Sequence, residues 1–327
     1  MEKKRLTTAA GAFIGLLILI LDGKTALQGA RTGIDLCLSV VIPSLFPFFL
    51  LSILLTQSLS GFSLSITRCK RIFPGIPTGA ESVLIPGFLG GYPAGAQSIG
   101  VSYQTGCLKK QDAERMLSFC NNAGPSFLFG MVSGMFEAPG AVWALWGIHV
   151  FSALLVGMLL CGGDAGECMP SSSSKVSVTE CLNRAIRIMA TVCGWVILFR
   201  VIIAFFDRWF LWSVPAELRV LLIGLLELSN GCCELKTVAD FSLRFLICSV
   251  MLSWGGLCVA MQTRSVIGDL TAKPYFRGKL LQTAFATLLS IAFIKHHFLP
   301  VFFFILITAA FLQKNQKKGS IRKVIGV

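Results

Sequence analysis

The stretch Gly87-Phe88-Leu89-Gly90-Gly91-Tyr92-Pro93-Ala94-Gly95 breaks an apolar segment in the first half of the chain. It cannot form an ordinary membrane helix, because glycine weakens helices and proline lacks an N–H donor and clashes with the preceding turn. Further along, Phe119-Cys120-Asn121-Asn122-Ala123-Gly124-Pro125-Ser126 interrupts another apolar segment. Broken helices survive at membrane depth only where protein covers them or where they line a watery cavity. Close helix packing by small residues and interhelical hydrogen bonding are the alternatives to a site, and we favour the site.

The same order of elements occurs again in the second half of the chain. The break Gly224-Leu225-Leu226-Glu227-Leu228-Ser229-Asn230-Gly231 is followed by the interrupted apolar segment Leu252-Ser253-Trp254-Gly255-Gly256-Leu257-Cys258-Val259-Ala260-Met261-Gln262. A pair of interrupted segments in corresponding halves is typical of the binding site of a secondary transporter.

The composition predicts a membrane protein. The chain has 327 residues, of which 54% are hydrophobic and 14% charged, and its mean hydropathy is +0.75. Soluble domains carry about a quarter charged residues. The net charge of +13 would suggest nucleic acid in a soluble protein, but Lys and Arg gather in the cytoplasmic loops of membrane proteins. No aromatic-basic nucleic-acid motif occurs, so we expect a lipid bilayer as partner and no nucleic acid.

Eight stretches free of Asp, Glu, Lys and Arg mark candidate spans, since a membrane helix needs roughly 20 apolar residues. They are 6–21, 36–67, 82–108, 116–136, 140–161, 245–263, 280–294 and 298–312. With the N-terminus inside, span 6–21 crosses outward and a segment beginning near Asp35 returns. Segments around 188–206 and 241–263 cross in the second half. The first break then enters from the inside and the second from the outside, so the two copies have inverted topology.

We therefore predict an all-α polytopic membrane protein with about eight transmembrane helices and two re-entrant broken-helix hairpins, arranged as two inverted repeats. Both termini are expected to be cytoplasmic, which follows the positive-inside rule. The expected divisions are an N-terminal span at 1–30, a first repeat with a linking span at 31–161, a polar cytoplasmic loop at 162–178, a second repeat at 179–266, and a short helical hairpin with a basic tail at 267–327.

The candidate substrate-binding residues are the backbone groups and polar side chains at the breaks, because freed N–H and C=O groups need partners that a substrate can supply. They are Gly90, Gly91, Tyr92, Pro93, Gly95, Asn121, Asn122, Gly124, Pro125, Ser126, Glu227, Ser229, Asn230, Gly255, Gly256 and Gln262. Glu227 either binds a proton, a cation or a substrate, or is merely interfacial. For Arg200 we favour snorkelling to the interface over a place near the site.

The sequence predicts neither a metal, a cofactor nor an enzyme. The twelve cysteines form no C-x-x-C pattern and are expected to be free thiols. His149 stands alone in a span, and adjacent His296 and His297 diverge on a helix or strand. No G-x-S-x-G or H-E-x-x-H motif is present. A coupling ion, proton or sodium, stays open.

Four motifs give the chain a resemblance to a known family. They are Leu45-Phe46-Pro47-Phe48-Phe49, Gly90-Gly91-Tyr92-Pro93-Ala94-Gly95-Ala96, Phe119-Cys120-Asn121-Asn122-Ala123-Gly124-Pro125 and Trp254-Gly255-Gly256-Leu257. They resemble the sporulation integral membrane proteins of the YlbJ type, which are built from nucleoside-recognition "Gate" repeats and are similar to the core of concentrative nucleoside transporters.

The resemblance implies a membrane of a sporulating Gram-positive cell and movement of a small metabolite, with dipicolinate suggested by the family and nucleosides by the fold relatives. Our preferred hypothesis is thus a secondary transporter working by alternating access on a small-molecule substrate, for which a homo-oligomer is compatible. The alternative is a non-transporting membrane scaffold for the spore envelope. An intramembrane enzyme is a third hypothesis, which lacks a convincing nucleophile and base.

Overall fold

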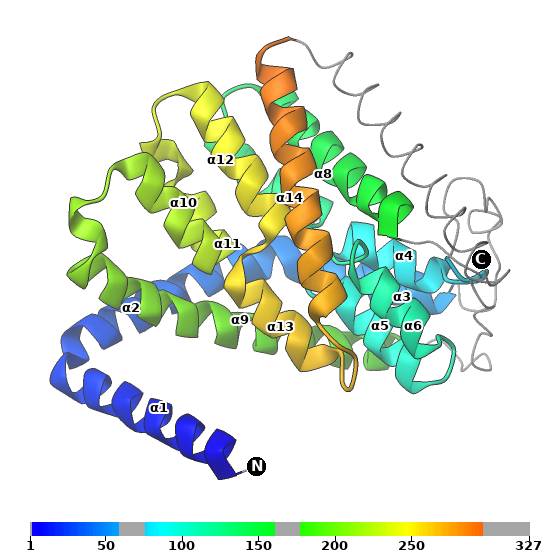
Figure 1. Cartoon of the computed structure of the whole chain (residues 1–327), viewed down its shortest axis with the longest axis horizontal. Coiled ribbons are helices and arrows are strands. Elements are labelled where there is room, and N and C mark those ends of the chain that lie inside the picture. Colours follow the sequence, from blue (N-terminus) through cyan, green and yellow to red (C-terminus); the bar gives the residue numbers. More distant parts are fainter. Residues whose placement is uncertain (1, 59–75, 161–176, 297–327) are drawn as a thin grey trace, which may run out of the picture.

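The computed structural model describes residues 2–58, 76–160 and 177–296, and every regular element in these ranges is helical (Figure 1). Six longer helices form the frame: α1 (Glu2–Leu21), α2 (Gly23–Leu36), α3 (Ile42–Ser58), α8 (Pro139–Leu160), α9 (Val178–Trp209) and α14 (Lys273–Ile294). A single turn of π-helix, η1 (Cys37–Val41), joins α2 to α3 without a break. The predicted all-α fold class is therefore confirmed for the described residues.

The remaining helices form two sets of four, which follow the same order in both halves. The first set is α4 (Glu81–Ile85) continuing through η2 (Pro86–Gly90), then α5 (Ala94–Gln104), α6 (Lys110–Leu117) and α7 (Pro125–Gly130). The second set is α10 (Ala216–Leu226), α11 (Leu228–Glu234), α12 (Phe241–Trp254) and α13 (Gly256–Val266). Each set is thus a broken hairpin followed by a broken helix, as the sequence predicts. The inverted relation between the sets stays a prediction.

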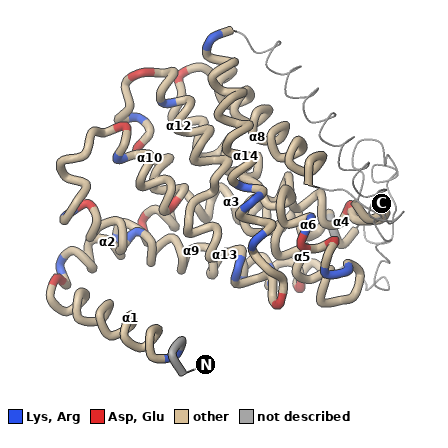
Figure 2. Tube along the Cα trace, in the orientation of Figure 1, with Lys and Arg blue, Asp and Glu red and all other residues tan. Residues whose placement is uncertain are grey.

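Four helices of the described residues are long and apolar enough to cross a membrane. They are Gly23–Leu55, Pro139–Leu160, Val178–Trp209 and Phe241–Val266. Charged residues gather at turns and helix ends, and the long helices are mostly free of them (Figure 2). The chain is therefore an integral membrane protein. The expected number of about eight transmembrane helices is not confirmed.

The structure corrects three of the expected spans. The returning helix begins at Gly23 rather than near Asp35, because the Asp22 side chain caps it by accepting from the Thr25 N–H at 3.3 Å. Segment 116–136 is not one continuous helix, since it is extended between α6 and α7. Segment 280–294 belongs to the 22-residue helix α14, which begins at Lys273. Segment 298–312 and most of the polar loop lie outside the described residues.

Two glycines let α2 lie directly against α9. A Cβ added to Gly29 would be 2.9 Å from the Val201 Cα, and one added to Gly33 would be 3.0 Å from the Ile197 Cα. This is small-xxx-small spacing, which allows close backbone approach in membranes. α9 also packs along α3, whereas α8, α12 and α14 pack on one another; the first hairpin lies against α3 and α6, and the second lies against α12 (Figure 1).

We expect Gly29→Val to separate α2 from α9 and to lower the free energy of unfolding by about 1–3 kcal/mol, the usual cost of overpacking. Urea unfolding in detergent micelles, followed by circular dichroism, measures the change. Gly15→Val in α1 is the control, because a Cβ there has nothing within 4 Å. Equal stability of the two variants would show that the α2–α9 contact is dispensable.

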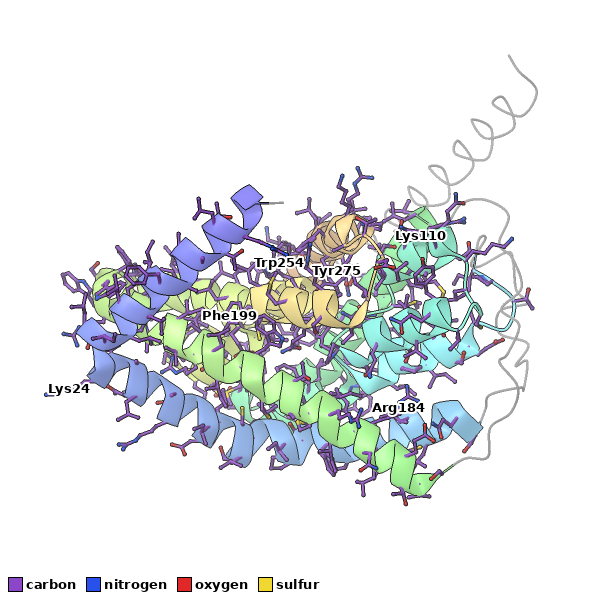
Figure 3. The ribbon with its side chains drawn as sticks, turned by 90° about the horizontal axis from the view of Figure 1, so that it is seen from below. Lys24, Lys110, Arg184, Phe199, Trp254 and Tyr275 are labelled. Atoms are coloured by element: carbon purple, nitrogen blue, oxygen red, sulfur yellow. The ribbon has the colours of Figure 1, made fainter. Side chains whose placement is uncertain are left out.

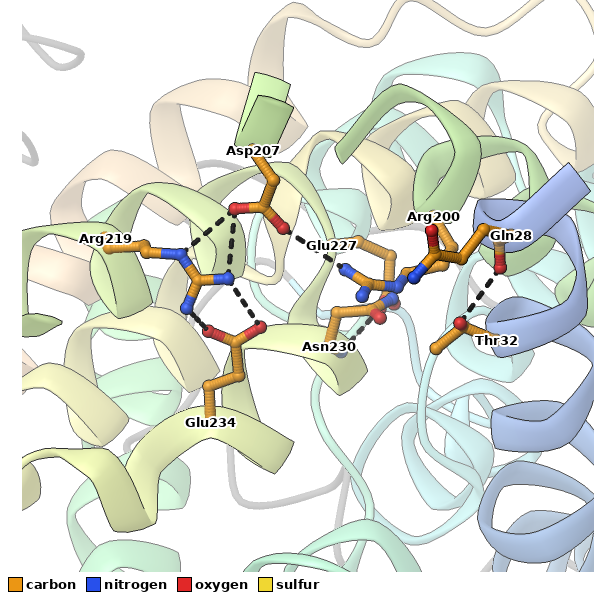
Figure 4. A network of polar contacts seen from close by, with 8 residues as sticks. All are labelled: Gln28, Thr32, Arg200, Asp207, Arg219, Glu227, Asn230 and Glu234. Atoms are coloured by element: carbon orange, nitrogen blue, oxygen red, sulfur yellow. Dashed lines mark hydrogen bonds and ion pairs between the residues drawn. The ribbon is translucent and has the colours of Figure 1, made fainter. Parts of the chain in front are cut away.

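A cluster of ion pairs ties α9, α10 and α11 together beyond the apolar core. The Arg219 guanidinium lies between the carboxylates of Asp207 and Glu234 (Figure 4). Arg200 lies 3.9 Å from the second oxygen of Asp207 and is largely covered, with 18% of its side chain exposed. It therefore lies near a carboxylate about two turns further along its own helix, and its snorkelling to the interface stays a prediction.

Among the described cysteines, eight are free thiols, as expected: Cys37, Cys120, Cys181, Cys193, Cys232, Cys233, Cys248 and Cys258. Cys107 is disulfide-bonded, so the expectation of free thiols throughout is wrong at that position. Cys107 lies in the turn between α5 and α6 and packs against a buried apolar cluster that includes Leu108.

Candidate functional site

The breaks of the first half lie against each other. α5 is separated from η2 by Gly91, Tyr92 and Pro93, and Gly91 takes φ +79°, a conformation that favours glycine. A Cβ on Gly124 would lie 2.8 Å from the Gly91 N, so the two backbones touch where the hairpin and the broken helix are both interrupted. Small residues at both positions are therefore required by packing.

The breaks of the second half meet in the same way. α12 ends at Trp254 and is followed by Gly255, whose φ of +82° places it in the left-handed region, and α13 starts at the next residue. A Cβ on Gly256 would be 3.1 Å from the Gly224 carbonyl oxygen and 3.2 Å from the Leu226 carbonyl oxygen. One on Gly255 would be 3.2 Å from the Tyr92 ring. All four breaks therefore converge on one region of the molecule.

A small cavity lies where the breaks converge. It is lined by groups from both sets of broken helices and from α3, α7 and α9: Leu45, Gly91, Tyr92, Ala123, Gly124, Phe127, Val192, Val196, Glu227, Leu228, Ser229, Val259 and Gln262. Its volume is about 30 Å³, which holds a water molecule or two. In this conformation the cavity is too small for a metabolite.

Six of the predicted site residues line this central cavity. They are Gly91, Tyr92, Gly124, Glu227, Ser229 and Gln262. The other ten lie beside or behind it: Gly90, Pro93, Gly95, Asn121, Asn122, Pro125, Ser126, Asn230, Gly255 and Gly256. Gly95 serves packing, because a Cβ there would be 2.0 Å from the Cys120 carbonyl oxygen. Ser126 is buried, and its hydroxyl makes no hydrogen bond within the described structure.

Glu227 supplies the carboxylate of the cavity and is only 2% exposed. It precedes α11 and accepts hydrogen bonds from the Ser229 N–H at 3.1 Å and the Asn230 N–H at 2.7 Å. The Asn230 side-chain amide donates to the same carboxylate at 2.6 Å. The carboxylate thus caps the helix N-terminus, where backbone donors favour negative charge. Glu227 is thus buried at the break, and its binding role stays a prediction.

Asn121 joins the first set of broken helices to the second. Its Oδ1 accepts from the Ala96 N–H at 3.3 Å on α5, and its Nδ2 donates to the Thr263 hydroxyl at 2.8 Å on α13. The side chain is fully buried. The amide is therefore occupied by interhelical hydrogen bonds in this conformation. Interhelical hydrogen bonding is the alternative to a binding role for the asparagines.

Asn122 is the centre of a network that reaches α14. Its Nδ2 donates to the Phe119 carbonyl at 2.6 Å and the Gly87 carbonyl at 3.3 Å. Its Oδ1 accepts from Lys279 Nζ at 3.3 Å and from Gln282 Nε2 at 3.0 Å. Both halves of the amide are therefore used, and Asn122 fixes the extended segment between α6 and α7 to a helix more than 150 positions away.

Lys279, Gln282 and His149 complete this network, and the sequence analysis did not single out Lys279 or Gln282. Lys279 and Gln282 lie one turn apart on α14, with 1% and no exposure respectively. His149 on α8 accepts the Ala123 N–H at 3.1 Å through Nε2. The sequence does place a lysine one position before the charge-free stretch 280–294. By itself this position indicates a charged residue flanking a membrane span, but α14 begins about two turns earlier, so Lys279 lies inside the helix.

A second cavity lies further along the same face of α9. It measures about 50 Å³, and its lining is mostly apolar but includes the polar side chains of Gln57, Gln97, Ser98 and Arg184. On α9, Arg184 and Ile188 line this cavity and Val192 and Val196 line the central one, at a spacing of four residues. Such residues share one helix face and extend over about 18 Å. Arg184 lies where α9 runs beside α3 (Figure 3).

The chemistry of the region suits binding more than reaction. The described residues contain no group of three His, Cys, Asp or Glu side chains placed to hold a metal ion. The cavity offers one carboxylate, the Tyr92 ring, the Ser229 hydroxyl and the Gln262 amide beside interrupted backbone. These groups can accept and donate hydrogen bonds to a polar ligand.

Comparison with known proteins gives one named relative. The chain is 26% identical over 315 residues to the sporulation integral membrane protein YlbJ of Bacillus subtilis (strain 168), covering 80% of this chain and 76% of the relative. No family model matches the chain, and no solved structure matches it. The similarity runs over most of both chains and supports the resemblance that the four motifs predict: this chain is a homologue of the sporulation integral membrane protein YlbJ.

Proposed function

We propose that this protein is a secondary transporter that moves a small polar metabolite across a membrane of the sporulating cell by alternating access. The observation that carries the proposal is the convergence of four helix breaks, two from each half, on one cavity that contains a buried carboxylate. Interrupted helices with unpaired backbone groups at such a place are the usual way in which transporters form a midplane site. Dipicolinate and nucleosides are the candidate substrates.

The α9 face supports an access path for this transporter. The residues that line the two cavities follow one another along it from Arg184 to Val196. A rearrangement that separates the first hairpin from α9 would join the cavities. Alternating access would then consist of opening this side while the second hairpin closes the other.

Uptake by purified protein in proteoliposomes tests the proposal, with labelled dipicolinate and labelled uridine as the two probes. We expect saturable uptake of one of them. Glu227→Gln keeps an acceptor oxygen but removes the charge, and we expect it to lower the rate by about tenfold or more, since hydrogen bonds to charged groups contribute about 1.5–3 kcal/mol. Exposed Glu217 in α10 provides the control, and Glu217→Gln should transport like the unchanged protein.

A non-transporting membrane scaffold is the second candidate. It is favoured by the asparagines, whose side chains are both occupied by internal hydrogen bonds. This candidate predicts no uptake of either probe by folded protein, and it predicts that Glu227→Gln leaves sporulation unaffected. Saturable uptake that is lost in Glu227→Gln and kept in Glu217→Gln would eliminate it.

A further inference from the structure

Lys279 is a buried lysine without a buried carboxylate beside it. It lies in α14, is 1% exposed, and makes no ion pair with any Asp or Glu of the described residues. Its Nζ lies 4.9 Å from the centre of the Tyr92 ring, a cation–π contact that partly compensates the charge. A buried charge is costly unless it is paired. The position therefore calls for a function that a neutral side chain does not serve.

The hydrogen bonds around Lys279 match a protonated ammonium. Nζ donates to the Tyr92 hydroxyl at 2.9 Å, to Asn122 Oδ1 at 3.3 Å and to Gln282 Oε1 at 2.8 Å. An ammonium has three donors and no acceptor, so its three hydrogens are used by three oxygens. A neutral amine has only two hydrogens and a lone pair. The surroundings therefore distinguish the two protonation states by geometry.

Tyr92 connects this difference to both sets of broken helices. It lies in the first break, and its hydroxyl donates to the Leu252 carbonyl at 3.1 Å. Leu252 precedes the break at Gly255 by three residues. When Lys279 loses its proton, the amine lone pair can accept from the Tyr92 hydroxyl, which then releases the Leu252 carbonyl. A proton on Nζ thereby holds the first break to the second, and its loss frees them.

The described titratable groups that surround Lys279 are two tyrosines, a histidine and a cysteine. The Tyr275 ring lies 6.0 Å away on the same helix, and Tyr92 faces it from the first break. His149 approaches from α8 and Cys120 from the segment after α6. From α12 it is the Leu252 carbonyl that reaches the network, through Tyr92. A neutral tyrosine, thiol or imidazole carries no negative charge. None of these groups therefore stabilises the protonated form of Lys279 as a carboxylate would.

We propose that Lys279 is the binding site of the coupling proton, and that the Tyr92 hydroxyl transmits its occupancy to the two halves. The inference rests on the proposed transport function and names its coupling ion. The proton adds to the Nζ lone pair when water reaches the network from one side and leaves to water on the other. Lys279 itself lies behind Tyr92 and does not line the central cavity.

The first test compares accumulation with exchange in the same proteoliposomes. An imposed proton gradient should drive accumulation of the transported probe by the unchanged protein, and a pH-sensitive dye trapped inside should register proton movement with it. For Lys279→Gln we expect exchange of labelled for unlabelled probe to persist while accumulation above the medium concentration is lost. Lys279→Arg should behave in the same way, because arginine keeps its proton. Lys273→Gln, at an exposed position on the same helix, is the matched control.

The second test needs no substrate. Hydrogen–deuterium exchange of the peptide containing Leu252 to Gly256 is measured at acid and alkaline pH and corrected for the intrinsic effect of pH. We expect this peptide to exchange faster at alkaline pH in the unchanged protein and in Lys273→Gln, and to lose that dependence in Lys279→Gln and Lys279→Arg. If both Lys279 variants fail to fold, the comparison of the unchanged protein with Tyr92→Phe, which lacks the hydroxyl, replaces them.

The outcomes separate the two proposals. Absence of uptake and exchange of both probes by folded, unchanged protein would overturn the proposed transport function. The deuterium exchange would still show whether the protonation of Lys279 controls the contact between Tyr92 and Leu252. Proton-driven accumulation by Lys279→Gln, accumulation driven by sodium alone, or an unchanged pH dependence of the Leu252–Gly256 peptide in the variants would each overturn the assignment of the coupling proton to Lys279.

Discussion

Gly278→Ala is expected to prevent stable folding. A Cβ at this position would lie 1.8 Å from the carbonyl oxygen of Ser118, 2.6 Å from its carbon and 2.7 Å from its Cα, all of them backbone atoms. Backbone at the end of α6 cannot turn aside as a flexible side chain does, so α14 would have to move away. Lys279 is the next residue, and the polar network would separate with it.

Overpacking in a protein core costs about 1–3 kcal/mol and sometimes more, and here the loss of the Lys279 hydrogen bonds adds to that cost. We expect Gly278→Ala to lower the free energy of unfolding by at least about 3 kcal/mol. The measurement is the yield of monodisperse protein in detergent, together with its thermal unfolding temperature.

Gly147→Ala in α8 provides the control for this variant. An added Cβ there has nothing within 4 Å, and alanine favours a helix over glycine by up to about 1 kcal/mol. We therefore expect Gly147→Ala to be as stable as the unchanged protein or slightly more stable. If the two variants unfold at the same temperature, the close contact between α14 and the Ser118 backbone does not hold in solution.

Asn122→Ala is expected to abolish transport and to destabilise the protein. It removes the oxygen that accepts from Lys279 and Gln282 and leaves the Phe119 and Gly87 carbonyls without their donor. Unsatisfied buried polar groups cost about 1–3 kcal/mol each, and more when charged. We expect about 3 kcal/mol of lost stability and no measurable uptake, with the variant still inserted in the membrane.

Asn122→Asp is the informative companion of this variant. It keeps an oxygen where Lys279 donates at 3.3 Å and places a carboxylate there, so it offers the ammonium an ion pair but removes the amide donors. We expect its stability to lie between that of Asn122→Ala and that of the unchanged protein. A carboxylate would also hold the proton on Lys279, so accumulation should be lost while probe exchange persists.

Fluorescence-detected size exclusion and uptake in the same preparation measure both effects of the Asn122 variants. Normal uptake by Asn122→Ala would show that the polar network has no part in transport. Equal instability of the Ala and Asp variants would indicate that the amide donors, and not the contact with Lys279, account for the loss of stability.

The sequence by itself determined the class of the protein and the positions of its breaks. Low charge and long apolar stretches predict that α8 and α9 lie in the lipid bilayer. Gly91, Pro93, Pro125 and Gly255 cannot continue a helix without cost, and each lies at an observed break. Local backbone chemistry decides where a helix stops. The sequence alone therefore predicts these breaks, without knowledge of the tertiary structure.

The span boundaries were less readable, because a charge-free window does not show where a helix begins. Helix α2, capped by Asp22, begins twelve positions before the expected start near Asp35, and α14 carries Lys273, Arg277 and Lys279 ahead of its charge-free part. Charge placement predicts flanks only when the helix lies in lipid on all sides. Helix α14 instead turns Lys279 and Gln282 toward Asn122.

Only the tertiary structure decided which polar groups meet. The sequence shows that the asparagine pair is an unusual polar interruption of an apolar segment. Its partners, however, are Thr263 on α13 and Lys279 on α14, about 140 to 160 positions away. Likewise Glu227 and Tyr92 share a cavity only because the two sets of broken helices pack together. A sequence shows which residues are costly to bury. Which of them satisfy one another depends on long-range packing, since hydrogen bonds act over about 3 Å and the chain alone does not bring such distant positions together.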